Sequence, residues 1–573
     1  MISEGPSKIL VLGDKPRIAA RLESEQHDVT LFGSPTNVGQ ANADIESAQL
    51  RELASDPTRR IRRLNGEFVV LIETADEIVI GNDRFSALPV FYMVEDGKLV
   101  LTFSYQAIWR RLKDQNKLKL DKLAFFEFLH FQRLFGETTL DEATKVLPPA
   151  SLLTLSKETG AIKISRYWNP DFTKRTDGLN AIATDLADAV KASVARKTAD
   201  AANVSLLLSG GMDSRVVLGG FSKDNLPLCV TIGEVENNEV DVARSLANIA
   251  GADHSFVQRS TSHYADTLTD SALVGGSMYM FQHGHFFGLD MPDTDLILHG
   301  HGFDYLFQGM YLPSTRQQIL GRRTRSWALD PIGPDLAGEY TRKAKYKLKG
   351  IDPSTLLKSE FAAQANDKIR ADIESVLGSI EGVTAEPYDD WDFVTTSAPG
   401  RHYTYLNLLS ASSIKEQRTI AFDNDIFDIY YSTPAKVRHG TRLLAETIRQ
   451  LNPDLLKVRN ANTNLRPDLT PTQLTVKAWA RGAKRRLGFG GSLQADPSVS
   501  DRSWPTGDSL LRNSQALRDR VDELRHSEHL ESIGIFDSGM IRTLIDDSNS
   551  GNDSVATALL TLITIDEFLR SAI

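Results

Sequence analysis

A short run of small and polar residues near the middle of the 573-residue chain has the composition of a phosphate-binding loop. Residues 204–208 read Val-Ser-Leu-Leu-Leu, which predicts a buried parallel strand, and residues 209–214 read Ser-Gly-Gly-Met-Asp-Ser. The apolar residues that follow predict a helix. The two glycines let backbone N–H groups approach a ligand, and these groups and the helix N-terminus together favour a phosphate. Because a carboxylate repels a phosphate unless a cation lies between them, Asp213 is a predicted Mg²⁺ ligand.

The spacing within this loop separates it from two other nucleotide loops. It has neither the Lys-Ser/Thr ending of a Walker A loop nor the three glycines of a dinucleotide fingerprint. A strand, Ser-Gly-Gly-x-Asp-Ser and a helix together resemble the pyrophosphate loop of the ATP pyrophosphatases, which cleave ATP between its α and β phosphates. A plain turn is the alternative, but a turn would not require the strand before it and the helix after it. The resemblance implies that ATP is bound by Ser209, Gly210, Gly211, Asp213 and Ser214.

Two more strands are predicted to end at the same place. Residues 228–233 form one of them, followed by a predicted helix over 239–247, and residues 295–298 form the other. The second is followed by His-Gly-His-Gly-Phe-Asp at 299–304. Since ligands of open α/β sheets bind at the carboxyl ends of strands, Asp304 should face Asp213, and the two carboxylates should share one Mg²⁺.

The first third of the chain has the pattern of strands joined by turns. Residues 68–72, 77–81, 89–93 and 98–102 predict four strands of a meander. More specific phrases are Leu-Asn-Gly-Glu-Phe from position 64, Asn-Asp-Arg-Phe-Ser-Ala-Leu-Pro from position 82 and Arg-Tyr-Trp from position 166. Together with the pyrophosphate loop behind them, they resemble the N-terminal glutaminase domain of the asparagine synthetase family, whose members include the β-lactam synthetases and the lasso peptide cyclases.

The family resemblance adds nucleotide contacts to those of the first loop. Residues 299–309 resemble the family's Ser-Gly-Glu-Gly-Ser-Asp-Glu-Leu-Phe-Gly-Gly segment, which places Gly300 and Gly302 among the nucleotide-binding residues. The resemblance also implies that Thr231, Ile232 and Gly233 line the adenine pocket through backbone groups. A strand in the hydrophobic core is the alternative for these three residues, and both interpretations can hold.

Three residues are candidates for catalysis. His301 stands where asparagine synthetases have a glutamate and β-lactam-forming relatives a tyrosine; it could take a proton from an attacking amine or only hydrogen-bond within its loop. Arg442 lies near the point where family members place a lysine on the triphosphate, and a guanidinium also holds phosphate well. The family's Arg-x-Lys-x-Gly phrase has no lysine at its catalytic position here, so Lys457 is the candidate, with Arg459 and Arg466 as alternatives.

The cysteine content argues against a working glutaminase. Enzymes of that kind need a cysteine directly after the initiator Met, whose thiol attacks the glutamine amide. This sequence begins Met-Ile-Ser-Glu, its single cysteine is Cys229, and nothing supports Ser3 as a replacement. We therefore expect no glutamine hydrolysis. A single cysteine also excludes a disulfide framework and a cysteine-based metal site.

Composition and charge restrict the partners. A net charge of −10 argues against a nucleic-acid scaffold, and the basic residues of 477–486 are interpreted as one solvated helix face. No signal peptide and no apolar run long enough to span a bilayer are found, which predicts a cytoplasmic protein. The oligomeric state, including a homodimer, is left open by the sequence.

These observations predict an α/β protein of two domains. Residues 1–170 should form a degenerate, β-rich glutaminase-like domain, and residues 178–573 an ATP-dependent synthetase domain with a parallel sheet, a helical C-terminal part and an amphipathic helix over 557–570. The predicted enzyme uses ATP and Mg²⁺ to adenylate a small-molecule or peptide carboxylate, and transfers the acyl group to ammonia or an amine. Ring closure by an internal amine, as in the β-lactam synthetases and lasso cyclases, and a catalytically quiet nucleotide-binding protein are the alternatives.

Overall fold

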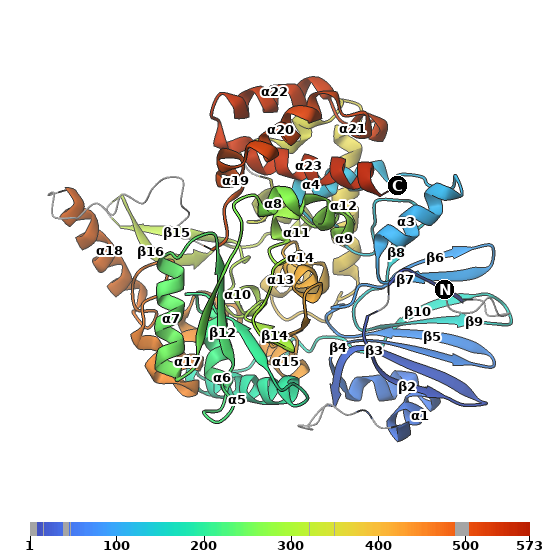
Figure 1. The fold of residues 1–573 in the computed structure, drawn as a ribbon, viewed down its shortest axis with the longest axis horizontal. Helices are drawn as coiled ribbons and strands as arrows, with labels where there is room; N and C mark the ends of the chain where they lie inside the picture. The colour runs from blue at the N-terminus through green and yellow to red at the C-terminus, as the bar shows by residue number, and fades with distance from the viewer. Residues whose placement is uncertain are drawn as a thin grey trace.

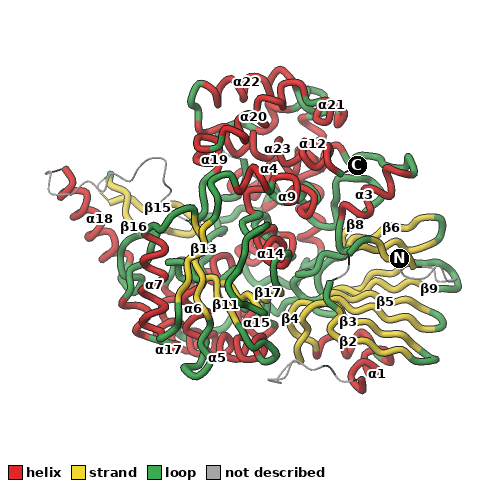
Figure 2. The backbone as a smooth tube through the Cα atoms, in the orientation of Figure 1, coloured by secondary structure: helices red, strands yellow, loops and turns green. Residues whose placement is uncertain are grey.

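The computed structural model describes residues 9–14, 16–37, 45, 47–319, 321–348, 350–486 and 503–572. Two β-sheets from the N-terminal third lie on one side of the molecule, a five-stranded sheet lies nearer the centre, and helices from the C-terminal end form a layer above them (Figure 1). Figure 2 shows that the strands gather in these two regions and that helix and loop make up most of the rest. Among the described residues, no helix is both long enough and apolar enough to cross a membrane.

The N-terminal sheets share one hydrophobic core. Val69 and Ile80 from the first sheet and Tyr92 and Leu101 from the second belong to the same buried cluster. The antiparallel six-stranded sheet contains, in order, β10 (Ile162–Arg166), β9 (Ser151–Ser156), β5 (Glu77–Asn82), β4 (Leu64–Thr74), β3 (His27–Asn37) and β2 (Ile18–Glu23). The four-stranded sheet contains β1 (Ile9–Leu12), β7 (Lys98–Thr102), β6 (Phe91–Glu95) and β8 (Lys145–Val146).

The predicted meander is wrong in its pairing, although its four strands are present. β4 pairs with β5 in one sheet, whereas β6 pairs with β7 in the other. The chain changes sheets after β5 because the buried Asp83 carboxylate accepts hydrogen bonds from the backbone N–H groups of Phe68 (2.9 Å), Phe85 (2.7 Å) and Ala87 (3.2 Å). These bonds close a local turn and direct the chain away from the first sheet before Phe91.

The central sheet is entirely parallel. Its order is β13 (His254–Gln258), β12 (Leu228–Gly233), β11 (Val204–Leu207), β14 (Leu296–His299) and β17 (Glu416–Thr419). Helices α5 (Leu179–Thr198), α6 (Asp213–Gly220), α7 (Asn238–Ala250) and α17 (Arg442–Leu451) pack around it (Figure 1). Since parallel strands with helical connections are buried on both faces, this arrangement accounts for the nearly continuous apolar strands in the sequence.

The helical layer surrounds α23 (Ala556–Ser571). This position corrects the expectation of an amphipathic helix at the end of the chain. A helix over 557–570 is confirmed, but it is not amphipathic, because every side chain from Ala558 to Leu569 is buried, including Asp566 and Glu567. Arg520 neutralises both carboxylates, at 3.0 and 2.9 Å. The neighbours of α23 in this layer are α9 (Leu268–Gly275), α19 (Gly507–Asn513), α20 (Gln515–Glu523), α21 (Glu528–Ile533) and α22 (Ser538–Asn549).

Further helices connect these parts. They are α1 (Ser47–Ser55), α2 (Pro57–Arg60), α3 (Tyr105–Asp114), α4 (Lys122–Phe131), α8 (His263–Asp266), α10 (Phe303–Phe307), α11 (Leu336–Lys343), α12 (Ala362–Gly378), α13 (Pro387–Thr396), α14 (Leu406–Ser412), α15 (Asn424–Ser432), α16 (Ala435–Arg438) and α18 (Pro471–Arg486). A hairpin of β15 (Ser314–Ile319) and β16 (Arg322–Leu329) lies beside α18. The α/β fold class is confirmed: a β-rich N-terminal region, a parallel sheet and a helical C-terminal part are all present.

Buried polar contacts join the N-terminal sheet to the parallel sheet. The Glu67 carboxylate accepts a hydrogen bond from the backbone N–H of Thr419 (2.5 Å) and lies 3.6 Å from Lys197 Nζ. Asn65 Oδ1 accepts a hydrogen bond from the backbone N–H of Asn424 (2.8 Å). Residues 169–178, the predicted boundary between the domains, contain no helix or strand, and the boundary itself stays a prediction.

Candidate active site

The glycine loop joins β11 to α6, as the sequence predicts. Ser214, in the first turn of α6, accepts a hydrogen bond from the backbone N–H of Ser209 (3.0 Å), and the two hydroxyls lie 3.0 Å apart. Gly211 N–H donates to the Ser209 hydroxyl (3.2 Å). The two serines therefore fold the loop back on itself before any ligand is bound.

Gly210 is required by a neighbouring segment of the protein. A Cβ at this position would clash with the side chain of Ala461, whose backbone N–H donates to Gly210 O at 3.1 Å. Asn238 Nδ2 also donates to Ala461 O (3.0 Å). The segment around Ala461 thus lies directly against the glycine loop. It follows Lys457, the candidate for the family's catalytic lysine.

Arg215 is the positioning residue that the sequence analysis missed. Its guanidinium is fully buried and donates to the backbone carbonyls of Leu455 (2.8 Å), Val458 (2.9 Å) and Arg459 (3.1 Å). It also donates to Gly210 O and Gly211 O, at 3.4 and 3.3 Å. Burial lowers the pKa of Arg215 to about 10. A single arginine among the apolar residues of the predicted helix was the signal that could have identified it.

The structure brings Asp213 and Asp304 together. Asp213 begins α6, Asp304 lies in the first turn of α10, and a Cβ on Gly300 would clash with the backbone of Asp213 and Ser214. Burial and repulsion by Asp304 raise the pKa of Asp213 well above its ordinary value, and burial raises the pKa of Asp304 to about 6. Gln308 Nε2 donates to Asp213 Oδ1 (2.8 Å).

This pair fits Mg²⁺ better than it fits a metal held by the protein alone. Two carboxylates in mutual repulsion are stabilised by a shared cation, and Mg²⁺ uses few protein oxygens because it retains water and phosphate oxygens. Within the described part of the chain, no group of three or more His, Cys, Asp or Glu side chains is placed to hold a metal ion. Asp213 and Asp304 would therefore hold the ion together with the phosphates of a nucleotide.

The predicted adenine pocket is small in this structure. A cavity of about 40 Å³ lies between Ser209, Thr231, Ile232 and Glu239, and Trp504 also lines it. Small-molecule sites measure roughly 300–1,000 Å³. The Thr231 hydroxyl is already engaged, since it donates to Leu208 O (2.7 Å) and lies 2.9 Å from His254 Nε2.

Trp504 is the second residue that the sequence analysis missed. Its ring lies over His285, with centroids 3.9 Å apart, and Ser503 N–H donates to the Glu239 carboxylate (2.9 Å). The Arg259 guanidinium stands 5.3 Å from the Trp504 ring and donates to Ser503 O (2.6 Å). These contacts attach the segment that contains Trp504 to the edge of the predicted adenine pocket.

His301 lies in an aromatic environment. Its ring contacts those of Tyr305, His402, Tyr405 and Phe422, with centroids 5.4–6.3 Å apart. Burial lowers the pKa of His301 to about 3, and its buried Nε2 has no hydrogen-bond partner among the described residues. The imidazole is therefore neutral near pH 7, and its Nε2 is open to a hydrogen bond from or to a substrate.

The two candidate cations occupy different surroundings. Arg442 is exposed at the start of α17, two residues after Gly440, whose N–H donates to Gln308 O (2.9 Å). Because Gln308 also binds Asp213, this contact places the start of α17 beside the aspartate pair. Lys457 is exposed and lies 2.6 Å from Asp454 on the surface. The structure does not bring Lys457 to the aspartates.

Cys229 is unsuited to nucleophilic catalysis. It lies in the middle of β12 and is fully buried, and burial together with Asp253 raises the pKa of its thiol to about 12. Ser3 lies outside the described residues.

Comparison with known proteins identifies the family of the central region. Residues 185–452 match the sequence model of the asparagine synthase family. Two Bacillus subtilis (strain 168) glutamine-hydrolyzing asparagine synthetases are similar: number 1 is 25% identical over 229 residues, which cover 37% of this chain and 35% of the relative, and number 3 is 27% identical over 188 residues, which cover 31% and 30%. The chain thus spans about a third of the length of these relatives. The match of residues 185–452 to this family model confirms the predicted resemblance to the asparagine synthetase family.

A third relative has a different reaction in its name. The carboxyethyl-arginine beta-lactam-synthase of Streptomyces clavuligerus is 21% identical over 319 residues, which cover 53% of this chain and 59% of that protein. Among solved structures, glutamine phosphoribosylpyrophosphate amidotransferase from B. subtilis, complexed with ADP and GMP, matches with a TM-score of 0.17 at 12% identity, over 42% of this chain and 49% of that one. At that TM-score the structural likeness carries no argument.

Proposed function

We propose that this protein is an ATP-dependent, AMP-forming ligase that makes an amide bond. The observation that carries the proposal is the Asp213–Asp304 pair beside a preformed glycine loop, in a chain whose residues 185–452 match the asparagine synthase family model. Backbone N–H groups of Gly210 and Gly211 and the hydroxyls of Ser209 and Ser214 would bind the phosphates of ATP, and Thr231, Ile232 and Gly233 would border the base.

The proposed reaction has two steps. A substrate carboxylate attacks the α-phosphorus of ATP, which forms an acyl-adenylate and releases pyrophosphate; an amine then attacks the acyl carbon, which releases AMP and forms the amide. Mg²⁺, held by Asp213 and Asp304, would neutralise the charge of the leaving pyrophosphate. Arg442 would add positive charge there, and His301, whose Nε2 has no partner among the described residues, would hydrogen-bond the attacking amine, which gives its proton to solvent. Catalysis then depends on position and charge and needs no protein nucleophile.

The nitrogen donor in this proposal is ammonia or an amine. The single cysteine of the sequence is Cys229, which is buried in β12, and this supports a donor other than glutamine. Ammonia would give a primary amide, whereas an amine within the substrate would close a ring. The similarity to a β-lactam synthase over about half of this chain supports the second outcome as much as the synthetase matches support the first.

A catalytically quiet nucleotide-binding protein is the second candidate. This candidate is favoured by the small volume of the predicted adenine pocket. It is also favoured because Lys457 pairs with Asp454 on the surface instead of with the two aspartates of the site. Such a protein would bind ATP and would not form AMP.

Pyrophosphate release tests the proposal. The assay contains ATP, Mg²⁺, candidate carboxylates, and either ammonia or glutamine, and it compares the wild type with Asp213→Asn and Asp304→Asn. Asp428→Asn is the control, because Asp428 pairs with Arg84 at 2.9 Å on the surface. We expect pyrophosphate and AMP in equal amounts with ammonia and not with glutamine, and loss of most of the rate in the two site variants only. Full turnover in both site variants would overturn the metal assignment, and ATP binding without AMP would favour the quiet protein.

A further inference from the structure

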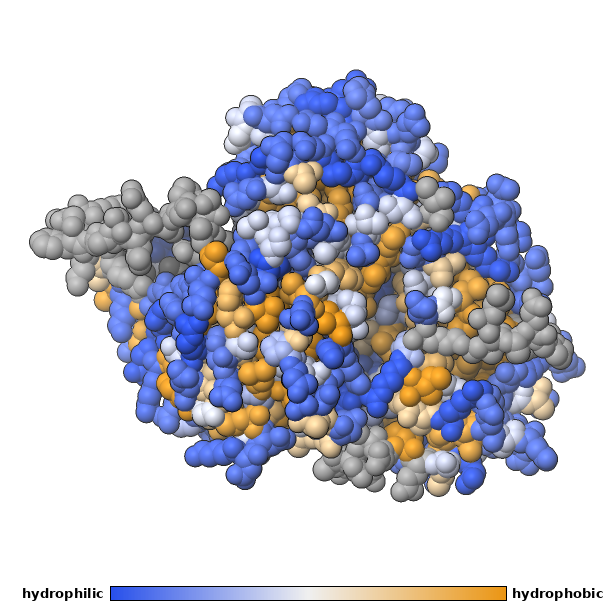
Figure 3. Space-filling view, in the orientation of Figure 1, coloured by the Kyte–Doolittle hydropathy of each residue, from blue (hydrophilic) through white to orange (hydrophobic). Residues whose placement is uncertain are grey.

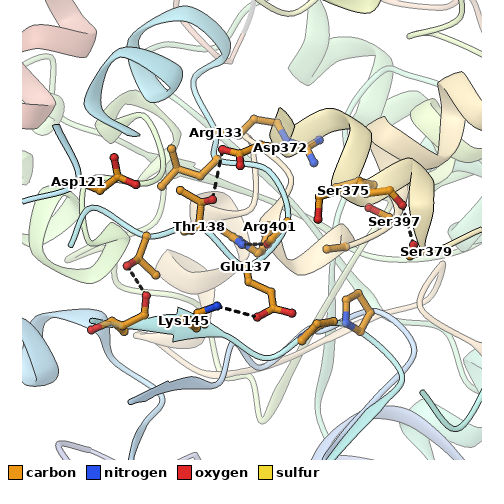
Figure 4. A pocket seen from close by; sticks show the side chains of 18 of the residues that line it. Asp121, Arg133, Glu137, Thr138, Lys145, Asp372, Ser375, Ser379, Ser397 and Arg401 are labelled. Atoms are coloured by element: carbon orange, nitrogen blue, oxygen red, sulfur yellow. Dashed lines mark hydrogen bonds and ion pairs between the residues drawn. The ribbon is translucent and has the colours of Figure 1, made fainter. Parts of the chain in front are cut away.

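A larger cavity lies between the N-terminal region and helix α12 (Figure 4). Its volume is about 450 Å³, within the roughly 300–1,000 Å³ range of small-molecule sites. It is bordered by the loop from Arg133 to Pro149 on one side and by α12 and the segment 397–401 on the other. None of the residues of the proposed ATP site lines it.

Three arginines in the wall of this cavity form no ion pair with the described residues, although the buried Glu127 carboxylate acts to raise the pKa of two of them, Arg133 and Arg401. Arg133 and Arg401 are only 5% and 6% exposed, and Arg166 is partly buried. Arg133 donates to the backbone carbonyls of Thr395 (2.7 Å) and Val394 (3.2 Å), while its buried Nε has no hydrogen-bond partner.

The other two arginines likewise donate to carbonyl and hydroxyl oxygens. Arg401 donates to Gly136 O and to Thr138 O (2.7 Å), and Arg166 to Ser379 O and its hydroxyl, at 3.3 and 3.4 Å. Burying a guanidinium without an ion pair is costly, so three such groups around one cavity require an explanation.

Five carboxylates also line the cavity, and four of them have ion-pair or hydrogen-bond partners among the described residues. Asp372 pairs with Lys368 (2.8 Å) and accepts from the Thr138 hydroxyl, and Glu137 lies 3.9 Å from Lys145 (Figure 4). Asp141 accepts hydrogen bonds from two backbone N–H groups and from the hydroxyl of Tyr105 (2.7 Å). Asp121 lies 3.4 Å from Lys368, whereas Glu142 is exposed and forms no ion pair with the described residues. The cations of this wall that lack an ion pair are therefore the three arginines.

We propose that this cavity is a binding site for a small oxyanion, a carboxylate- or phosphate-bearing metabolite, distinct from the ATP site. The anion would bind between Arg166 and Arg401, with further hydrogen bonds from serine hydroxyls of α12 and of the segment 397–401. Charge-assisted hydrogen bonds from guanidinium groups to an oxyanion are among the strongest available to a protein.

The site also has a physical connection to the ATP site. The carbonyls that hold Arg133 belong to the C-terminal turn of α13, and Trp391 of the same helix donates to Tyr311 O (2.9 Å). Tyr311 follows α10, the helix that contains Asp304. The wall of the cavity is thus connected through α13 to the segment that follows α10.

Thermal unfolding in the presence of two probes tests the proposal. Inorganic phosphate and succinate are compared with sodium chloride at equal ionic strength, because a specific ligand raises the unfolding midpoint beyond the general salt effect. We expect at least one probe to raise the midpoint of the full chain by about 2 °C or more. A response to phosphate alone indicates a phosphate-bearing ligand, one to succinate alone a carboxylate, and one to both an oxyanion in general.

Variants at the accessible side of the cavity locate the effect. Arg166→Gln removes one donor, and Ser375→Glu places a carboxylate on an exposed position of α12 without disturbing the core. In each variant, at least about ten times more probe should be needed for the same rise of the unfolding midpoint. This factor corresponds to the loss of one charge-assisted hydrogen bond. Arg175→Gln is the matched control, because Arg175 pairs with Asp177 and Asp185 outside the cavity.

Three outcomes would overturn the proposal. The first is that neither probe exceeds chloride. The second is an equal loss of response in Arg175→Gln, which would show a general charge effect. The third is a response that Ser209→Ala abolishes and Ser375→Glu retains, since that result would place the anion at the glycine loop.

Discussion

At the scale of single residues, the aspartate pair is costly to the protein without a ligand. Asp213 and Asp304 raise each other's cost of ionisation, and the structure has no third acidic or histidine ligand beside them in the described region. Such a pair is expected where a cation arrives with the substrate, because stability is then sacrificed for function.

Asp304→Asn should stabilise the ligand-free protein. The folded-state pKa of Asp304 is about 6, against 3.8 for an ordinary aspartate. As the pH rises between these values, the unfolded chain loses its proton first, so the wild type loses stability relative to the variant. We expect a gain on the order of 1–2 kcal/mol at pH 7 that disappears near pH 4. Urea unfolding of both proteins across this range would measure it, and a gain independent of pH would contradict the account.

Arg442 and Lys457 should differ in their contribution to catalysis. If Arg442 has the proposed role of adding positive charge beside the phosphates, Arg442→Ala should lower kcat/KM for ATP at least about tenfold. Lys457→Ala should cost much less, since Lys457 lies 2.6 Å from Asp454 on the surface. Steady-state kinetics of the two variants measure both losses. A larger loss of kcat/KM in Lys457→Ala than in Arg442→Ala would indicate that Lys457 is the catalytic cation.

The residues proposed to contact a ligand could be recognised in the sequence, whereas the residues that support them could not. Glycines, serines and aspartates at the ends of strands have a recognisable spacing, so Asp213 and Asp304 could be paired before the structure was available. Arg215 and Trp504 act through contacts with segments more than 200 residues away. No local pattern contains that information.

At the scale of elements, the segment that carries Trp504 lines the predicted adenine pocket. The pocket of about 40 Å³ cannot accept a purine ring unless Trp504 moves. The segment is attached by its contacts with Glu239, Arg259 and His285, which include one hydrogen bond to a carboxylate and one from a guanidinium. This small number of contacts is compatible with displacement by a ligand.

ATP binding should therefore change the tryptophan fluorescence. Trp504 leaves its contact with His285 when the pocket opens, and its emission should change as its surroundings become more polar. Titration of the wild type and of Trp504→Phe with ATP measures this, because the signal from the other five tryptophans is common to both. An identical response in the two proteins would show that Trp504 does not move.

Strands and helices were predictable individually, whereas their partners were not. Apolar runs identified β4, β5, β6 and β7, but the assignment of two of them to a second sheet depends on Asp83, which binds three backbone N–H groups. In the same way, the sequence indicated α23 as a helix and could not show that other helices cover its polar face.

At the scale of the whole molecule, a buried ion pair holds the N-terminal sheet against the parallel sheet. Glu67 and Lys197 are 3% and 1% exposed, with 3.6 Å between Oε1 and Nζ. Lys197 also donates to Thr419 O (2.5 Å) and Phe422 O (2.6 Å), so its ammonium belongs to the interface. Figure 3 shows apolar residues across the middle of one face, while the helices above are mainly hydrophilic.

Glu67→Gln should destabilise this interface by about 3 kcal/mol, because it leaves the Lys197 charge buried without a partner. Glu73→Gln is the control, since its pair with Lys157 (2.8 Å) is more accessible and should contribute less than about 1 kcal/mol. Urea unfolding measures both. The double variant Glu67→Gln/Lys197→Met should recover part of the loss, and strict additivity would show that the two residues do not interact.

The most direct test of the central claim is a calorimetric titration with ATP, with and without Mg²⁺, of the wild type, Asp213→Asn and Asp304→Asn. If the two carboxylates share a cation over the phosphates, Mg²⁺ tightens binding to the wild type at least about tenfold and much less in either variant. Without Mg²⁺ the order reverses, and the variants bind ATP more tightly because a repulsive charge is gone. Equal Mg²⁺ dependence in all three proteins would contradict the account.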